Sequence, residues 1–230
     1  MPYLKIFATF VFLVVSNALL GQSWDFTAPD YKAIEKAVAD EQGDFYYPNL
    51  NARFNDADSS LSLEELRHIY YGYIYESAYS PYSHSKYRST IRELLGKDSL
   101  TQADYKTLNS YCDSSLADFP FDLDAMSYKI WALKNLSDSL AYEQILWKHN
   151  SIVDVLISSG DGISPERAFY VINTSHEYYL LGVFGFKFGN QQSLIEECDL
   201  LDLAENEFEI DGLYFNVSAC LNHLNTMFDD

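Results

Sequence analysis

The spacing of apolar residues changes at the Gly-Asp-Gly segment 160–162, and this change constrains the fold more than any other feature of the chain. Before it, apolar side chains recur every three or four residues, as at Leu66, Ile69 and Tyr70, which is the period of a helix with one buried face. After it, short aromatic and β-branched runs alternate with turn residues, as in strands. Helices followed by strands predict an α+β fold rather than an alternating α/β fold.

The helical part is expected over residues 59–160. Ser62 and Glu65 have the spacing of a capping box, and Asp122 has the position of an N-cap before another apolar run. A long helix is expected over 139–158. It pairs with the helix before it as an antiparallel hairpin that resembles one tetratricopeptide unit. The resemblance depends on the proline, the small packing residues and the turn residue: Pro120, Ala125, Ala132, Asn135 and Ala141.

The remaining segments complete the predicted domain organisation. Residues 22–54 are expected to form an extended lead-in with one short helix at Tyr31–Ala39, and residues 55–230 a single α+β domain.

The C-terminal part of that domain is expected to be mainly β over 165–217, with a strand at 168–173 and a small antiparallel sheet from the short apolar segments of 187–203 and 213–217. Segment 177–185 fits a helical turn or a strand equally well. A helix at Ser218–Phe228 closes the chain.

Residues 1–21 have the composition of a cleavable secretory signal. Lys5 precedes an apolar run over 6–20, and Gly21 is a small residue at the cleavage point, which leaves Gln22 as the new N-terminus. The run is shorter than the roughly 20 apolar residues of a spanning helix, which argues against a retained anchor. We therefore expect an exported protein, periplasmic or secreted, with no membrane insertion once the signal is removed.

The charge of the chain restricts its partners. The net charge is −19 at pH 7, and an acidic surface of this kind repels phosphate backbones and anionic lipid head groups. No nucleic acid partner is therefore expected. An envelope protein or a small ligand is the expected partner, and no cofactor is predicted.

The three cysteines leave two alternatives open in an oxidising compartment. An odd number cannot pair completely, so one bridge, with Cys198–Cys220 the better candidate, would leave Cys112 free. Three buried free thiols are the other alternative, because cysteine often packs as a small apolar residue. The chain has no Cys-x-x-Cys pattern and no His-x-His or His-Glu-x-x-His pattern, so neither a redox site nor a metal site is predicted.

Two clusters of polar residues are the candidate binding sites, and no catalytic residue is assigned. Arg67, His68 and Tyr71 lie within two helical turns and can line a cleft. Asp161, His176 and Glu177 follow the Gly-Asp-Gly segment and can join them. With Ser158 or Ser159 as nucleophile, these groups also contain the elements of a hydrolase, although no Ser lies in a Gly-x-Ser-x-Gly pattern. Structural packing is the competing interpretation for all of them.

Four blocks of sequence, taken in order and spacing, resemble a bacterial exported family, domain of unknown function 4919, over most of the chain after the signal. The resemblance implies an envelope or secreted protein of Gram-negative bacteria. It implies no activity, cofactor or catalytic residue. The blocks are residues 62–73, 158–162, 168–178 and 213–217.

The leading hypothesis is therefore an exported binding or interaction module without catalysis. The first alternative is a hydrolase that uses polar groups between Ser158 and Glu177 together with Arg67 and His68. The second is a glycan-binding surface built on some of the nineteen tyrosines, whose faces can stack on sugars.

Overall fold

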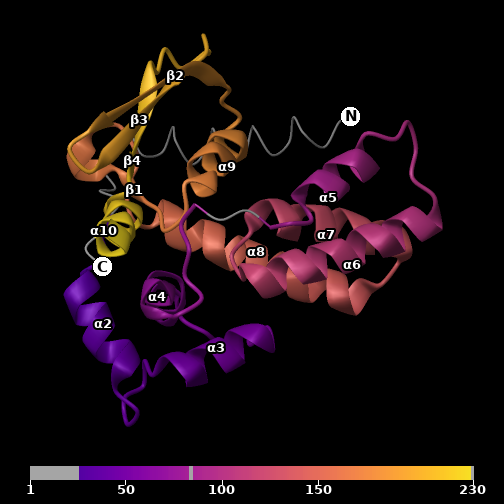
Figure 1. Cartoon of the computed structure of the whole chain (residues 1–230), viewed down its shortest axis with the longest axis horizontal. Coiled ribbons are helices and arrows are strands. Elements are labelled where there is room, and N and C mark those ends of the chain that lie inside the picture. Colours follow the sequence, from indigo (N-terminus) through magenta and orange to yellow (C-terminus); the bar gives the residue numbers. More distant parts are fainter. Residues whose placement is uncertain (1–25, 83–84, 229–230) are drawn as a thin grey trace, which may run out of the picture.

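The structure is a computed structural model that describes residues 26–82 and 85–228 (Figure 1). The predicted secretory signal at 1–21 lies outside these residues. The described chain is helical up to residue 157 apart from its connections, and it forms a sheet and two more helices after that point. The predicted α+β fold is confirmed.

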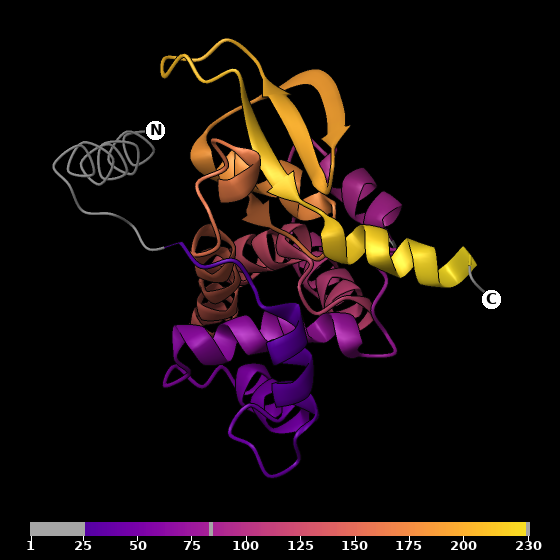
Figure 2. The same ribbon diagram turned by 90° about the vertical axis from the view of Figure 1, so that its left-hand side faces the viewer.

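The elements lie around a long central helix. Helices α2–α4 are at one end of the molecule, and the sheet with α9 is at the other (Figures 1 and 2). Two short 3₁₀ helices, η1 (Tyr73–Tyr75) and η2 (Pro165–Arg167), occur in the connections. The described α-helices are α2 (Tyr31–Ala39), α3 (Tyr47–Asn55), α4 (Leu63–Gly72), α5 (Arg88–Leu95), α6 (Gln102–Asp118), α7 (Leu123–Leu136), α8 (Ser139–Ile157), α9 (Ser175–Phe184) and α10 (Ser218–Phe228).

In the segment 22–54, expected as an extended lead-in, the described residues 26–54 are largely helical, so that part of the prediction is wrong. Besides the predicted α2 it contains α3, whose Pro48 lies at the start of the helix, where proline is tolerated, rather than breaking the chain. Tyr47, Leu50 and Phe54 of α3 are buried in the main core. Burial of this apolar face, which the mixed polar and aromatic composition of the segment conceals, makes it part of the domain.

Helix α4 is the central helix of the end formed by α2, α3 and α4. The predicted capping box is present: Ser62 Oγ accepts a hydrogen bond from the backbone N–H of Glu65 at 3.2 Å, and the Glu65 carboxylate accepts from the backbone N–H of Ser62 at 2.8 Å. Ile69 and Tyr70 are fully buried. The helix contacts α2, α3 and α8 and joins them into one core.

Helices α5, α6 and α7 form a smaller layer beside this core. Ile91 and Leu94 of α5 pack with Leu108, Cys112 and Ala132 in a separate apolar cluster. Helix α7 also packs against α8, and Ser137 in the left-handed conformation makes the turn between them. The likeness of α7 and α8 to a tetratricopeptide unit stays a prediction.

The sheet has four strands in the order β1-β4-β3-β2, namely β1 (Phe169–Tyr170), β4 (Gly212–Asn216), β3 (Cys198–Leu203) and β2 (Phe188–Ile195). Strands β2, β3 and β4 are antiparallel, but β1 pairs in parallel with β4, so the sheet is mixed and the prediction of an antiparallel sheet is corrected. The reason is the long connection from β1 through α9 and the β2–β3 hairpin, because only such a crossover allows a parallel pair.

The predicted strand region also contains a helix. Segment 177–185, which fitted two structures equally well, belongs to α9. The predicted strand at 168–173 is shorter than expected, because the Asn173 side chain accepts hydrogen bonds from the backbone N–H and hydroxyl of Ser175, at 2.9 and 2.7 Å, and turns the chain into α9. The region 165–217 is therefore α+β in itself.

The Gly-Asp-Gly segment between the two parts has a structural reason for its first glycine. A Cβ on Gly160 would lie 2.3 Å from the carbonyl oxygens of Arg167 and Ala168. Gly162 has a φ of +73°, a conformation that glycine adopts without strain. The segment therefore allows the chain after α8 to lie in close contact with the backbone just before β1.

Two further sequence questions are decided by the described residues. Cys112, Cys198 and Cys220 are all buried free thiols, so of the two alternatives the structure has the second and the Cys198–Cys220 bridge is absent. Among the helices of the described chain, none has both the length and the apolar character needed to cross a bilayer.

Candidate functional site

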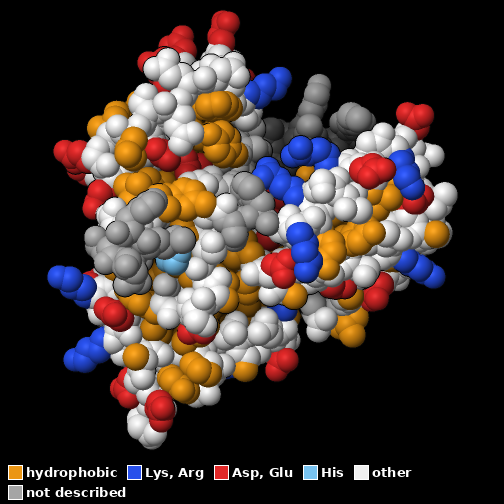
Figure 3. Space-filling model, in the orientation of Figure 1, with side chains coloured by type: hydrophobic (Ala, Val, Ile, Leu, Met, Phe, Trp, Pro, Cys, Tyr) orange, Lys and Arg blue, Asp and Glu red, His pale blue; other side chains and the backbone are white. Residues whose placement is uncertain are grey.

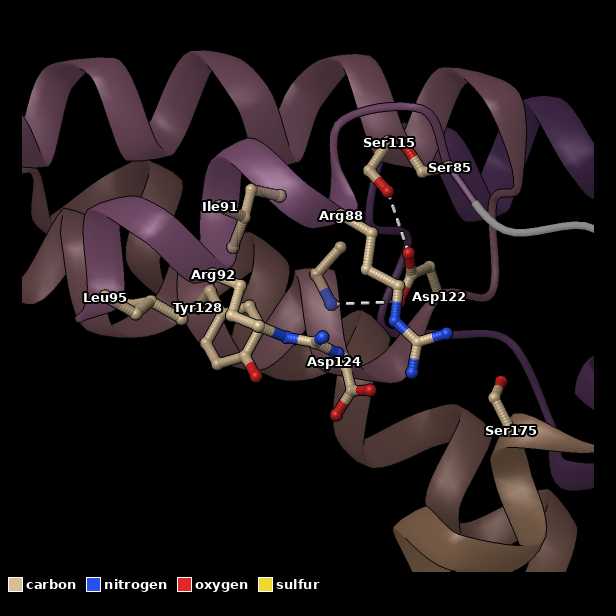
Figure 4. A pocket seen from close by; sticks show the side chains of 11 residues that line it. Ser85, Arg88, Ile91, Arg92, Leu95, Ser115, Asp122, Asp124, Tyr128 and Ser175 are labelled. Carbon is tan, nitrogen blue, oxygen red and sulfur yellow. Dashed lines mark hydrogen bonds between the residues drawn. The ribbon is translucent and has the colours of Figure 1, made fainter.

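A cavity of about 140 Å³ lies between α5, the start of α7 and the start of α9 (Figure 4). Its wall combines charged and hydroxyl side chains with the aliphatic side chains of α5. Such a concave site with a few convergent polar groups is typical of small-ligand sites. The polar lining groups that matter below are Arg88, Arg92, Asp122, Asp124, Tyr128 and Ser175.

The two arginines of the cavity differ from the other three arginines of the chain. Arg53 and Arg167 form ion pairs with carboxylates, and Arg67 donates hydrogen bonds to a hydroxyl and a carbonyl. Arg88 and Arg92 have neither an ion pair nor a hydrogen bond with any residue in 26–82 or 85–228. They lie four residues apart on one face of α5, and Figure 4 shows both guanidinium groups turned toward the start of α7.

Asp122 is fixed in the cavity wall as the N-cap of α7. Its carboxylate accepts one hydrogen bond from the backbone N–H of Ala125 at 3.0 Å and another from Ser115 Oγ at 2.8 Å. The capping role predicted from sequence is confirmed. Both oxygens of this carboxylate have protein donors, so its first task is structural.

Asp124, two residues further along, has no such partners. Its carboxylate takes part in no hydrogen bond or ion pair with the residues that the structure describes. Partial burial raises its pKa, the charge of Asp122 raises it further, and the positive charge of Arg88 lowers it. Burial also raises the pKa of the neighbouring Tyr128, an effect that Asp124 increases and Arg92 opposes.

Asp124 also borders a second, shallower hollow against α9, lined by Tyr178, Tyr179, Gly182 and Val183. The Tyr179 hydroxyl is held by Ser127 Oγ at 2.7 Å and by the His149 ring. The two hollows meet at Asp124, so one carboxylate faces both. On the face seen in Figure 3, basic side chains gather where the α5–α7 layer meets the sheet end of the molecule.

The sequence-predicted residues lie elsewhere, and the structure brings only some of them together. Arg67 is buried and donates to Ser158 Oγ at 2.7 Å and to the Thr27 carbonyl at 2.6 Å, while its guanidinium lies 5.3 Å from the ring centre of Tyr71. The Tyr71 side chain is fully buried. These groups form packing between α4 and the end of α8 rather than a cleft.

The two candidate nucleophiles are committed to backbone contacts in the same region. Ser158 Oγ donates to the Val155 carbonyl at 2.7 Å. Ser159 Oγ donates to the Leu156 carbonyl at 2.6 Å and accepts from the backbone N–H of Tyr170 at 2.9 Å. A hydroxyl that donates to a carbonyl has no proton to give to a base.

His68 and Asp161 have other partners than these serines. The His68 ring stacks on Phe45 with ring centres 3.9 Å apart, and its Nδ1 donates to the Glu64 carbonyl at 2.9 Å. Asp161 forms an ion pair with Arg167. Each has a structural partner, so neither serves the other as base or orienting acid.

His176 is fully buried and connects three parts of the fold. Its Nε2 lies 2.9 Å from the Phe121 carbonyl, so this nitrogen carries the proton, and its Nδ1 accepts from the Tyr70 hydroxyl at 2.7 Å. Burial lowers its pKa to about 4, so the ring is neutral at pH 7. His176 therefore fastens the start of α9 to α4 and to the turn before α7.

Glu177 faces the other way, toward the sheet, where sequence reasoning missed its partner Asp199. Both Glu177 oxygens are buried, and neither receives a hydrogen bond from a described donor. Burial, and then the Asp199 charge, raise its pKa to about 9, so at pH 7 it is a neutral carboxylic acid near Asp199. Asp199 Oδ2 also accepts from Gln192 Nε2 at 2.8 Å, and Gln192 Oε1 accepts from the Tyr178 hydroxyl at 2.6 Å.

The tyrosines give the glycan hypothesis a limited surface. Tyr70 and Tyr71 are fully buried, whereas Tyr82 and Tyr178 are 39% and 43% exposed. Burial is the largest cause that raises the pKa of both exposed tyrosines. Asp199 and Glu177 raise it further, together with Cys220 for Tyr82, so the two phenols lie near the same pair of acidic residues.

The cavity residues carried a signal that was available in the sequence. Arg88 and Arg92 are four apart in a segment where a helix was expected, so they had to share a face. Within the described residues no group of three or more His, Cys, Asp or Glu side chains has the arrangement of a metal site.

Comparison with known proteins agrees with the resemblance seen in the sequence. The family model described as "Domain of unknown function (DUF4919)" matches residues 32–226. Searches of curated proteins and of solved structures returned no match. The match runs from within α2, through the cavity and the sheet, to within α10, and the chain belongs to the DUF4919 family of domains of unknown function.

Proposed function

We propose that this protein is a non-catalytic binding module, acting after export from the cytoplasm, that holds a small ligand by an anionic group on Arg88 and Arg92. The observation that carries the proposal is the state of these two arginines. In a chain with a net charge of −19, both line a cavity and neither has an ion pair in the described chain. An acidic protein offers many partners to a guanidinium, so two without one on the same face favour an external anion.

The cavity offers an anion more than charge. Each of the two guanidinium groups presents parallel N–H donors whose spacing matches the oxygens of a carboxylate or a phosphate. The Ser85 side chain lines the same cavity and adds a hydroxyl donor, since in the described chain its oxygen only accepts a hydrogen bond from the Tyr87 backbone N–H. A charge-assisted hydrogen bond contributes about 1.5–3 kcal/mol, so two of them correspond to dissociation constants of about a millimolar.

The test uses the five arginines of the chain as reporters. The protein, purified as the host cell processes it, is titrated with butyrate and, separately, with inorganic phosphate while the arginine Nε–Hε signals are followed by NMR. We expect the signals of Arg88 and Arg92 to move with saturation. The double variant R88Q/R92Q lacks these two reporters. The parent and the variants are therefore also compared through the backbone N–H signals of Asp124 and Tyr128 in the cavity wall, which should no longer respond in R88Q/R92Q.

Arg167→Gln is the matched control because it also removes one exposed guanidinium, outside the cavity. This variant should bind like the parent protein. Linear shifts of all five signals without saturation, or equal losses in R88Q/R92Q and R167Q, would show that the anion only screens charge, and the proposal would fail.

The two alternatives from sequence are weaker for different reasons. The hydrolase alternative needs a free nucleophile beside a base, whereas the hydroxyls of Ser158 and Ser159 donate to backbone carbonyls and both ring nitrogens of His176 are occupied. The glycan alternative retains Tyr82 and Tyr178. It predicts that an oligosaccharide shifts the ring signals of these two tyrosines and leaves the arginine signals unchanged.

A further inference from the structure

Asp124 is the feature of the cavity that anion binding alone does not explain. A site that only held an anion would gain nothing from a second carboxylate in its wall, since like charges repel. Asp122 has a structural reason to be there, because it caps α7. Asp124 lies in the first turn of α7, where the helix dipole favours an acid, but in the described chain it accepts no hydrogen bond and forms no ion pair.

The opposite charges of the cavity also do not pair with one another. Arg88 is close enough to lower the pKa of Asp124, yet the two side chains do not form an ion pair. In the view of Figure 4 the Asp124 carboxylate lies close to both guanidinium groups, and all three side chains line the same cavity. A molecule with a negative and a positive group would pair with the guanidinium groups and with the carboxylate at once.

We propose that the ligand is a zwitterion, whose carboxylate lies on Arg88 and Arg92 and whose ammonium group lies on Asp124. This inference rests on the proposed function and names the class of its ligand. The cavity of about 140 Å³ has the volume of about five water molecules, which suits an amino acid of about half a dozen heavy atoms. Any longer side chain extends past Asp124 into the hollow lined by Tyr178 and Val183.

The test compares molecules of equal shape that differ in one charge. β-Alanine and butyrate are such a pair, because the ammonium of the first replaces the terminal methyl of the second. γ-Aminobutyrate and valerate form the next pair, and glycine with propionate the shorter one. Each is titrated against the protein as processed by the host cell, and binding is read from the Arg88 and Arg92 Nε–Hε signals.

We expect at least one amino acid to bind about tenfold more tightly than its uncharged-end partner, the gain of one charge-assisted hydrogen bond. In D124N this preference disappears, while butyrate binds at least as well as before. Asp118→Asn is the matched control, because Asp118 is an exposed acid at the end of α6 that does not line the cavity. It should leave the preference unchanged.

The outcomes separate this inference from the proposed function. If butyrate saturates the arginine signals but no amino acid of the series binds more tightly, the ligand is a simple anion and the inference is overturned. If the preference survives in D124N, Asp124 is not the acid that selects the ammonium, which also overturns it. If no carboxylate affects Arg88 or Arg92, the proposed function itself fails.

Discussion

The carboxylic acid of Glu177 gives the stability of the fold a pH dependence that one substitution removes. The folded protein holds this proton up to about pH 9, because burial and the neighbouring Asp199 charge disfavour ionisation. In the unfolded chain the same carboxyl loses the proton near its ordinary pKa of 4.5. Between these two values the folded state binds one proton more than the unfolded state, so the free energy of unfolding falls as the pH rises.

The slope of this loss is about 1.4 kcal/mol per pH unit for one proton. From pH 6 to pH 8 the folded protein therefore loses about 3 kcal/mol through this group. The Glu177 side chain is fully buried, so solvent screening does not reduce the effect. A domain has about 5–15 kcal/mol of stability in total, so the loss is large enough to measure.

Glu177→Gln keeps the shape of the side chain and puts an uncharged amide in place of the carboxylic acid. We expect the difference in unfolding free energy, variant minus parent, to grow by about 3 kcal/mol between pH 6 and pH 8. Urea unfolding followed by tryptophan fluorescence at several pH values measures it, with Trp147, which is partly buried against the core, as a reporter. Glu143→Gln, an exposed site on α8, is the control.

A difference that stays constant from pH 6 to pH 8 would refute the reasoning, because it would mean that the folded state does not hold the extra proton. Asp199→Asn separates the two causes. Burial is the larger one, so the slope should remain in this variant but begin to level off at a lower pH.

Three further predictions concern the core. Gly160→Ala should lower the free energy of unfolding by about 3 kcal/mol in urea, because its Cβ meets two carbonyl oxygens, whereas Gly182→Ala, where a Cβ meets nothing, should raise it by about 0.5–1 kcal/mol. Tyr70→Phe should cost about 2 kcal/mol in the same assay, because it leaves His176 Nδ1 and the Ile172 N–H unpaired. The three thiols should not react with Ellman's reagent until the protein unfolds, since all are buried; rapid reaction of the native protein would contradict that burial.

Much of the fold could be predicted because its signals are local. The bounds of α2 and the capping box of α4 follow from residues within one or two turns, and so does the N-cap at Asp122. The end of α8 also follows from its glycine segment. Local rules decide these elements because the groups that satisfy them are near in sequence.

The errors have non-local causes. Helix α3 forms because Leu50 and Phe54 are buried by α4, which a mixed local composition does not reveal. Strand β1 is parallel because its partner β4 comes after a helix and a hairpin. Neither contact could be inferred from the segments themselves.

The candidate site shows the same division. The shared face of Arg88 and Arg92 follows from their spacing, but the lack of an acidic partner depends on the arrangement of three helices in space. The residues favoured from sequence, such as His176, are polar residues in an apolar context because they form hydrogen bonds within the core. Polar residues in an apolar context mark buried networks as often as they mark sites.

The separate apolar cluster under α5 has a consequence for motion. Helix α5 has eight residues and is anchored through Ile91 and Leu94 to that small cluster, whereas α9 is tied by His176 to the main core. Local opening costs least where few apolar contacts are lost, so α5 is expected to detach before α9, and its amides to exchange with solvent sooner. The two arginines therefore belong to the helix that opens first, whereas Asp124 and Ser175 belong to helices that stay folded. A ligand that bridges the arginines to these helices would slow the amide exchange of α5 first.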